Sequence, residues 1–118
     1  MHIHLLKSKI HQARITQCDL NYEGSLGIDL AIMDAVGMLT YERILVVNAT
    51  NGERLETYAI PAERGSRTFC LNGAAARRGA VGDVLTVMAF ATVDAAEVAT
   101  ATPKVVVLDA DNSIVRRK

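Results

Sequence analysis

Hydrophobic residues along this chain fall mostly into short runs of extended character, and each run ends at a polar or glycine-containing stretch. Runs of this length that are rich in Val, Ile and Thr are typical of β-strands. They predict strands at residues 10–16, 26–29, 42–50, 53–60, 67–72, 83–93 and 103–109. Seven or so short strands without a long helix favour an all-β barrel or a compact sandwich.

Glycine, asparagine and alanine mark the connections between these runs. Asn51-Gly52 separates two of them and predicts a hairpin with a type I′ turn, because that turn needs positive φ at both central residues. Residues 30–37 predict two helical turns that end at Gly37, since glycine commonly follows the last residue of a helix. Residues 72–79 predict a short, alanine-rich helical turn.

Length and composition indicate one domain over residues 1–118 with an aliphatic core. The chain has no internal repeat or linker, and it is half hydrophobic although only 4% of it is aromatic and it lacks Trp. Thirteen basic and thirteen acidic residues give a formal net charge of zero. No strong field therefore favours nucleic acid or an anionic membrane as a partner.

The ends of the chain and its cysteines indicate a cytoplasmic protein. The first 15 residues carry charges every few positions, so they predict neither a signal peptide nor a membrane span. Cys18 and Cys70 are isolated and are expected to be free thiols in a reducing compartment. The basic residues 116–118 are expected to form a solvated tail.

The histidines do not predict a metal site. His2, His4 and His11 lie near one another on an extended segment, and His11 follows only two residues after Lys9. No carboxylate or cysteine stands close in sequence to complete a ligand set. We therefore expect the protein to bind no metal.

The segment Asn21-Tyr-Glu-Gly-Ser25 carries the clearest functional signal. A Gly-Ser dipeptide alone is usually a turn. Here it occurs in order with TNGERLETYAI at 50–60, ERGSR at 63–67 and NGAAA at 72–76. In this combination the chain resembles the bacterial aspartate 1-decarboxylases, the pyruvoyl-dependent enzymes that make β-alanine. The resemblance runs from Lys9 to about Phe90 and weakens toward the C-terminus.

The resemblance implies both a fold and an activity. It implies a six-stranded double-psi β-barrel with short helices, assembled as a homotetramer with active sites between adjacent subunits. It also implies self-cleavage at Gly24-Ser25 into residues 1–24 and 25–118, with Ser25 converted into a covalent pyruvoyl cofactor in place of pyridoxal phosphate. The mature enzyme is then expected to convert L-aspartate into β-alanine and CO₂ for pantothenate biosynthesis.

The cleavage chemistry accounts for the residue types at the junction. A hydroxyl on the residue after the scissile carbonyl can attack that carbonyl, and Ser25 carries one. Glycine at position 24 removes the Cβ and permits an unusual backbone conformation beside the attacking oxygen. The resemblance assigns Thr57 to this step and to substrate binding, although a threonine in such a strand is more often a structural residue.

Further site residues are carried over by the resemblance. It implies that the substrate amine condenses with the pyruvoyl ketone and that Tyr58 then protonates the decarboxylated carbon. Arg54 is implied to bind the second carboxylate, and it shares one face of a strand with Tyr58 because the two are four residues apart. The remaining assignments are Lys9 as a second cation, the substrate-contacting turn Asn72, Gly73, Ala74 and Ala75, and His11 in support.

Three points stay open from the sequence. A non-catalytic β module, such as a small swapped-barrel DNA-binding domain, is the alternative function, although such a module should have a basic face. Cleavage at Gly24-Ser25 is either spontaneous or assisted by a maturation factor. Gly27 departs from the small polar or β-branched residue that the family often places there, which bears on the rate of cleavage.

Overall fold

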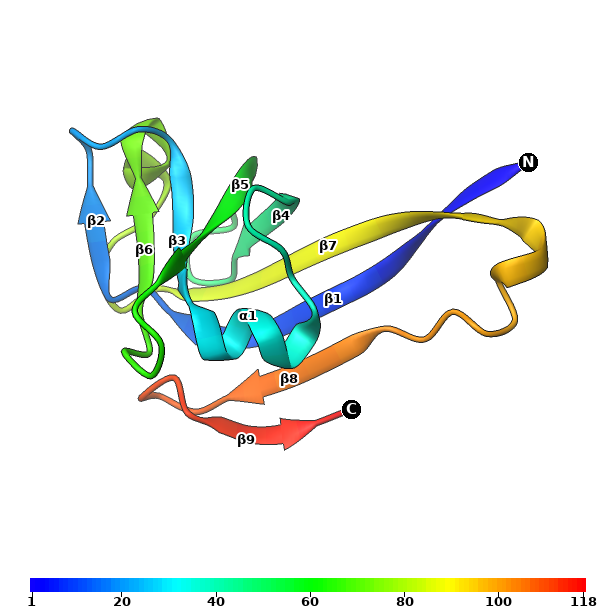
Figure 1. Ribbon diagram of the computed structural model, residues 1–118. Helices are drawn as coiled ribbons and strands as arrows, with labels where there is room; N and C mark the ends of the chain where they lie inside the picture. Colours follow the sequence, from blue (N-terminus) through cyan, green and yellow to red (C-terminus); the bar gives the residue numbers. More distant parts are fainter.

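A computed structural model describes all 118 residues as a mainly β protein, which confirms the predicted class (Figure 1). Its strands are β1 His2–Arg14, β2 Gln17–Asp19, β3 Ser25–Asp29, β4 Arg43–Asn48, β5 Arg54–Ala62, β6 Phe69–Asn72, β7 Val84–Asp94, β8 Lys104–Leu108 and β9 Ile114–Arg117. One α-helix, α1 Leu30–Val36, and two 3₁₀ helices, η1 Gly73–Arg78 and η2 Ala95–Glu97, complete the fold.

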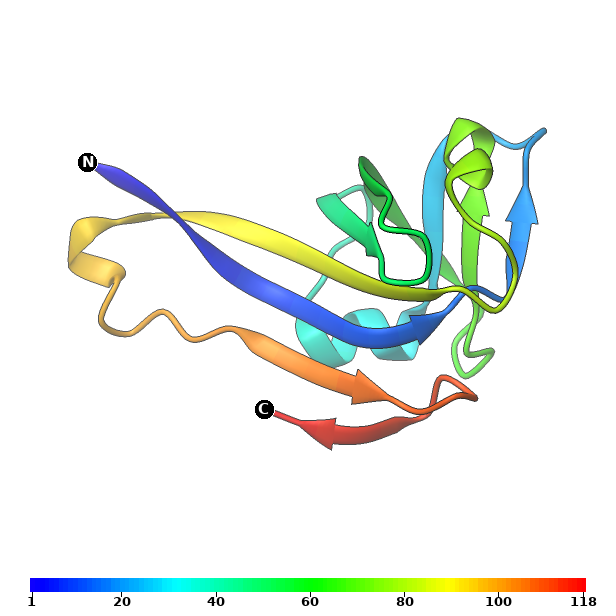
Figure 2. The same ribbon diagram turned by 180° about the vertical axis from the view of Figure 1, so that it is seen from behind.

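The strands follow the order β2-β6-β3-β5-β4-β7-β1-β8-β9. Several strands that are neighbours in the sheet are far apart in sequence, and the sheet contains both parallel and antiparallel pairs. For example, β3 runs parallel to β5 and antiparallel to β6. The long strands β1 and β7 pair antiparallel and form an arm that extends away from the rest of the molecule (Figures 1 and 2). The arm makes the single chain elongated, with extents of 43 × 28 × 25 Å.

Two terminal segments contain more strand than the sequence pattern predicted. β1 begins at His2, eight residues before the predicted start, because its N-terminal half pairs with β7 although polar residues interrupt its apolar pattern. The predicted solvated tail is also wrong in part, because Ile114–Arg117 forms β9 against β8. Pairing with another strand, the distant β7 for β1 and the preceding β8 for β9, holds these segments.

The hairpin between β4 and β5 is confirmed, but its predicted type I′ turn is wrong. Asn48 and Glu53 close the loop through a backbone hydrogen bond of 2.8 Å, which leaves four residues in the turn. Only Gly52 has a positive φ there, at 79°. The side chain of Asn48 accepts hydrogen bonds from the backbone N–H groups of Thr50 and Asn51, so the loop winds around this side chain.

The core consists of 19 buried residues and is aliphatic as expected, with Phe69 as its only aromatic side chain. The helix predicted at 30–37 is confirmed as α1, and Gly37 ends it in the left-handed conformation with φ 67°. Helix α1 covers the core between β3 and β8 (Figure 1). The helix begins at Leu30, directly after β3, and β3 is the strand that begins at Ser25.

Asp29 ties the start of α1 to the loop before β6. Its buried carboxylate accepts hydrogen bonds from the backbone N–H groups of Ala31 at 2.8 Å, Gly65 at 2.9 Å and Arg67 at 2.8 Å. Asp29→Ala removes the helix cap and leaves these donors without that partner. We expect it to lower the free energy of unfolding by about 2 kcal/mol, measured by urea denaturation.

Asp34→Ala is the matched control on the same helix. Asp34 is exposed and pairs only with the exposed Arg64, so its loss should cost at most about 1 kcal/mol. Equal destabilisation by the two alanine variants would contradict the capping role of Asp29.

Candidate active site

Ser25 lies at the start of β3, and its hydroxyl oxygen accepts a hydrogen bond. The residue is 1% exposed and pairs with Asn72 across the antiparallel strands β3 and β6. The side-chain amide Nδ2 of Asn72 donates a hydrogen bond of 3.0 Å to the Oγ of Ser25. The fold therefore brings together two sequence-predicted site residues that are 47 positions apart.

The turn that follows Asn72 packs against the peptide that precedes Ser25. Gly73 has φ 69°, and a Cβ added to it would lie 2.7 Å from both the Cα and the N of Gly24. A contact this short leaves no room for any side chain at position 73. The predicted substrate-contacting turn is thus in direct contact with the predicted cleavage junction.

A hollow of about 300 Å³ opens beside this junction. Its lining residues come from the β2–β3 connection, from β5 and from η1: Gly24, Leu55, Glu56, Thr57, Ala74, Ala75 and Arg78. Four of them, Gly24, Thr57, Ala74 and Ala75, are sequence-predicted site residues. The structure therefore gathers the predicted processing threonine and half of the predicted turn around Gly24.

Arg78 is a residue of this hollow that the sequence reasoning did not assign to the site. Its Nη1 donates to the Oε2 of Glu53 at 2.8 Å and to the backbone oxygen of Arg54 at 3.3 Å. The side chain of Arg54 itself does not line the hollow. The only sign of Arg78 in the sequence is that it follows Arg77 directly. Two consecutive arginines are usually a solvated surface feature.

The other predicted site residues lie on the opposite face of β5. Tyr58 and Arg54 alternate with Thr57, so their side chains lie on the face away from it. Glu56, between them on that face, pairs with Leu45, which pairs with Met88 and then with Lys9. Residues paired across antiparallel strands share a face, so Lys9 belongs to the same outward face as Tyr58.

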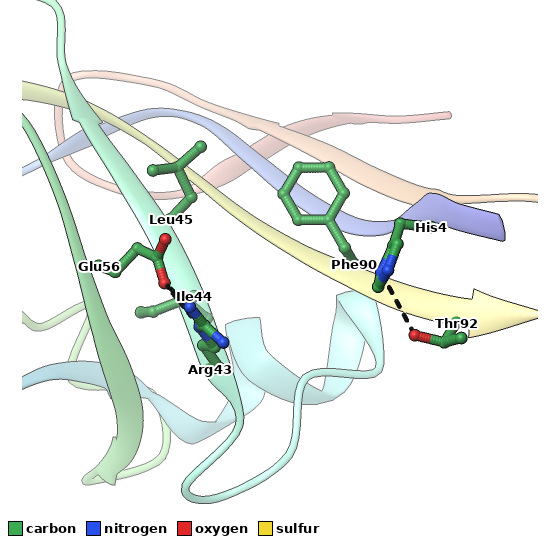
Figure 3. A pocket seen from close by; sticks show the side chains of 7 residues that line it. All are labelled: His4, Arg43, Ile44, Leu45, Glu56, Phe90 and Thr92. Atoms are coloured by element: carbon green, nitrogen blue, oxygen red, sulfur yellow. Dashed lines mark hydrogen bonds and ion pairs between the residues drawn. The ribbon is translucent and has the colours of Figure 1, made fainter. Parts of the chain in front are cut away.

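This outward face contains a second hollow, of about 450 Å³ (Figure 3). Arg43 and Glu56 form an ion pair at one side, and Phe90 and His4 of the arm lie at the other. No sequence-predicted site residue lines it; Tyr58 lies nearby on the same face, with its ring centroid 5.9 Å from that of Tyr41. The predicted residues of β5 therefore fall into two groups on opposite faces of this strand, and Glu56 lines both hollows.

His11 lies in a basic part of the surface and away from both hollows. Its Nδ1 is buried without a hydrogen-bond partner. Burial lowers the pKa of His11, and the positive charges of Lys9, Lys118 and Arg116 lower it further. The imidazole is consequently neutral at neutral pH. The charges of Lys9, Lys118 and Arg116 make its surroundings positive.

The two cysteines are free thiols, as the sequence predicted. Burial raises the pKa of Cys18, with a smaller contribution from Asp83. Burial also raises the pKa of Cys70, with contributions from Asp19 and Cys18. Both side chains are therefore protonated hydrogen-bond donors near neutral pH.

No group of three or more His, Cys, Asp or Glu side chains gathers closely enough to hold a metal ion. None of the helices has the length and apolar character needed to cross a membrane.

Known proteins resemble this chain over nearly its whole length. A family model described as aspartate decarboxylase matches residues 1–115. The aspartate 1-decarboxylase of Syntrophobacter fumaroxidans is 56% identical over 108 residues, which are 92% of this chain and 87% of that protein. The enzyme of the same name from Tolumonas auensis is 54% identical over 112 residues, covering 95% and 89% of the two chains.

A third relative extends the match further. The aspartate 1-decarboxylase of Caldicellulosiruptor saccharolyticus is 52% identical over 116 residues, covering 98% of this chain and 91% of that protein. These relatives favour an enzyme over the DNA-binding module that the sequence left as an alternative.

Proposed function

Because this chain belongs to the aspartate decarboxylase family, we propose that it converts L-aspartate into β-alanine and CO₂ after turning its own Ser25 into a pyruvoyl group. The observation that carries the proposal is the hydrogen bond of 3.0 Å from the Asn72 amide to the buried Oγ of Ser25. That bond places a donor on the oxygen that has to act as the nucleophile, directly after the Gly24 carbonyl.

The cleavage proceeds in steps that use only this chain and water. The Oγ of Ser25 bonds to the carbonyl carbon of Gly24, the bond from that carbon to the Ser25 nitrogen breaks, and the hydroxyl proton ends on that nitrogen. The resulting ester loses the Cα proton of residue 25 while the bond between Cβ and Oγ breaks, which releases a carboxylate at Gly24. Tautomerisation and hydrolysis of the dehydroalanine, with loss of ammonia, complete the pyruvoyl group.

The residues around the junction fit this chemistry. Gly24 has no atom within 4 Å of the place where a Cβ would stand, so that side of the junction peptide is open. Thr57 lines the same hollow and supplies a hydroxyl of the type that stabilises a developing oxyanion. The Asn72 amide stabilises negative charge on Oγ during attack and again when that oxygen leaves as part of the Gly24 carboxylate.

The decarboxylation step uses the second group of residues. The pyruvoyl group supplies the electron sink for loss of the substrate's α-carboxylate. Tyr58 donates a proton to the carbon from which the carboxylate departed. Arg54 and Lys9 bind the carboxylate that remains in the product, since both are cations on the face that carries Tyr58.

A homotetramer of six-stranded double-psi barrels unites the two groups. The first group, with Gly24 and Thr57, lies at the 300 Å³ hollow, whereas Tyr58, Arg54 and Lys9 lie on the outward face. An adjacent subunit placing its outward face over the hollow completes the site. The exposed side chain of Phe90 on the projecting arm supports burial of this face in an assembly.

The proposal includes a setting for the reaction. We place the enzyme in the cytoplasm and its product, β-alanine, in pantothenate biosynthesis. It binds neither nucleic acid nor a membrane surface, in line with its zero formal net charge.

Intact-mass measurement of the purified protein tests the proposal. We expect two polypeptides, residues 1–24 and residues 25–118, the second lacking a free amine and therefore blocked to Edman sequencing. Incubation with L-aspartate should then release β-alanine and CO₂. A full-length chain that persists on warm incubation, both alone and with host-cell extract, would contradict self-processing with or without a maturation factor.

Tyr58→Phe separates the two reactions. We expect cleavage at Gly24-Ser25 to continue at the wild-type rate, because Tyr58 lies on the face of β5 away from Thr57. Turnover of L-aspartate should fall by about 10²–10⁴-fold, the usual contribution of a positioned proton donor. Tyr41→Phe, which changes the neighbouring exposed ring, is the control and should keep its activity. Unchanged turnover in Tyr58→Phe would show that another group protonates the product.

A further inference from the structure

Cys70 is connected to the nucleophile through one intervening side chain. Its Sγ donates a hydrogen bond of 3.1 Å to the Oδ1 of Asn72, whose Nδ2 donates to the Oγ of Ser25 at 3.0 Å. Cys70 and Asn72 are two residues apart in β6, so both side chains lie on the face that meets Ser25 in β3. All three residues are buried, with 9%, 5% and 1% exposure in that order.

The chemistry of a thiol determines which way the amide of Asn72 is turned. A carboxamide has a donor end and an acceptor end, and a protonated thiol is a weak donor and a weak acceptor. Here the thiol donates to Oδ1, the orientation of the amide in which Nδ2 is directed at Ser25. Burial, Asp19 and Cys18 raise the pKa of Cys70, so the thiol retains the proton that it donates.

We propose that Cys70 is a positioning residue for the self-cleavage: its thiol holds the Asn72 amide so that the N–H of Nδ2 faces the Oγ of Ser25. The inference rests on the proposed function, since it concerns the step in which Oγ attacks Gly24. With the amide turned the other way, Oδ1 would face Oγ. It would then repel the negative charge that develops when the hydroxyl proton leaves.

Gly27 lies opposite this arrangement on the neighbouring strand. Gly27 pairs directly with Cys70 across β3 and β6. A Cβ at position 27 would lie 3.5 Å from the Cβ of Cys70 and 3.8 Å from the Nδ2 of Asn72. Both distances are ordinary van der Waals contacts, so an alanine at position 27 would pack against Cys70 and Asn72 without displacing them.

The rate of cleavage in freshly purified precursor tests the inference. The readout is the fraction of full-length chain over time, by intact mass, for wild type, Cys70→Ala and Cys70→Ser. Loss of the donor in Cys70→Ala leaves the buried Oδ1 of Asn72 without a partner and should slow cleavage by about tenfold. Cys70→Ser restores a donor and should cleave within about threefold of wild type.

Two further variants distinguish positioning from packing. Cys18→Ala removes the other free thiol, whose hydrogen bond goes to the Gly79 carbonyl at 3.6 Å and not to Asn72, and should cleave at the wild-type rate. In an Asn72→Ala background, replacing Cys70 by alanine should cause no further slowing, because the side chain that it positions is absent. A purely structural role for Cys70 predicts instead that the two substitutions add.

The outcomes separate the inference from the proposed function. If the wild-type chain does not cleave at all, the proposed function fails. If wild type cleaves and Cys70→Ala cleaves equally fast, the positioning role is wrong while the function stands. If Cys70→Ala misfolds, the comparison of Cys70→Ser with Cys70→Val, which differ in having a donor, decides the question: equal rates overturn the inference.

Discussion

Ser25→Ala is expected to leave the chain as one uncut polypeptide with no detectable decarboxylase activity. Alanine has no oxygen to attack the Gly24 carbonyl, so neither the ester nor the pyruvoyl group can form. The smaller side chain fits the buried site of Ser25 without a clash, and the fold should persist. Intact mass measures the first effect, and β-alanine formation from L-aspartate measures the second.

The chain contains its own matched control in a second Gly-Ser dipeptide. Gly65-Ser66 lies in an exposed loop, whereas Ser25 is buried against Asn72. Ser66→Ala should therefore process and turn over like wild type. Any residues 25–118 fragment from the Ser25→Ala chain, or any β-alanine made by it, would show that the reaction begins at another group.

Gly73→Ala is expected to have the second-largest effect on cleavage at Gly24-Ser25. It acts by displacing the backbone and removes no reacting group. The new Cβ would meet the Cα and N of Gly24 at 2.7 Å, and both are backbone atoms that cannot rotate away. The left-handed conformation adds about 1–2 kcal/mol for any residue with a Cβ. The Gly24-Ser25 peptide must therefore shift, and cleavage should slow by at least about 100-fold because a displacement of 1 Å can cost that much.

Gly52→Ala separates the clash from the conformational cost. Gly52 has φ 79° but no atom within 4 Å of its missing Cβ, so it bears the same backbone penalty without the contact. We expect it to lower the thermal midpoint modestly and to leave the rate of cleavage unchanged. Equal cleavage rates in the two glycine variants, by the same mass assay, would contradict the role of the Gly73–Gly24 contact.

The sequence predicted the helices and strands that are stabilised by residues within the same segment. The helix at residues 30–37 was predicted because its capping residue, Gly37, is part of the same segment. The hairpin after β4 was predicted from its turn residues, but the turn type was wrong because Asn48 is also held by Arg78 and Asp83 from distant segments. The first eight residues of β1, 2–9, were missed for the same kind of reason, since they are held by the distant strand β7.

The candidate site divides in a similar way. Ser25, Thr57 and Asn72 were identified from motifs, and the fold brings all three to one region. Arg78 and Cys70 carry no motif, and each gains its relevance only from what lies beside it. A hydrogen bond across two strands depends on their register, which a single strand does not encode.

The sequence by itself determined that this is a mainly β protein of the aspartate decarboxylase family with an aliphatic core, and it predicted Gly24-Ser25 as the centre of the chemistry. These properties follow from residue types and their order along the chain. Only the tertiary structure decided that Gly73 lies against Gly24, that Cys70 donates a hydrogen bond to Asn72 and Asn72 to Ser25, and that Tyr58 faces away from Thr57. Each of these depends on how β3, β5 and β6 pair, and long-range pairing sets which side chains meet.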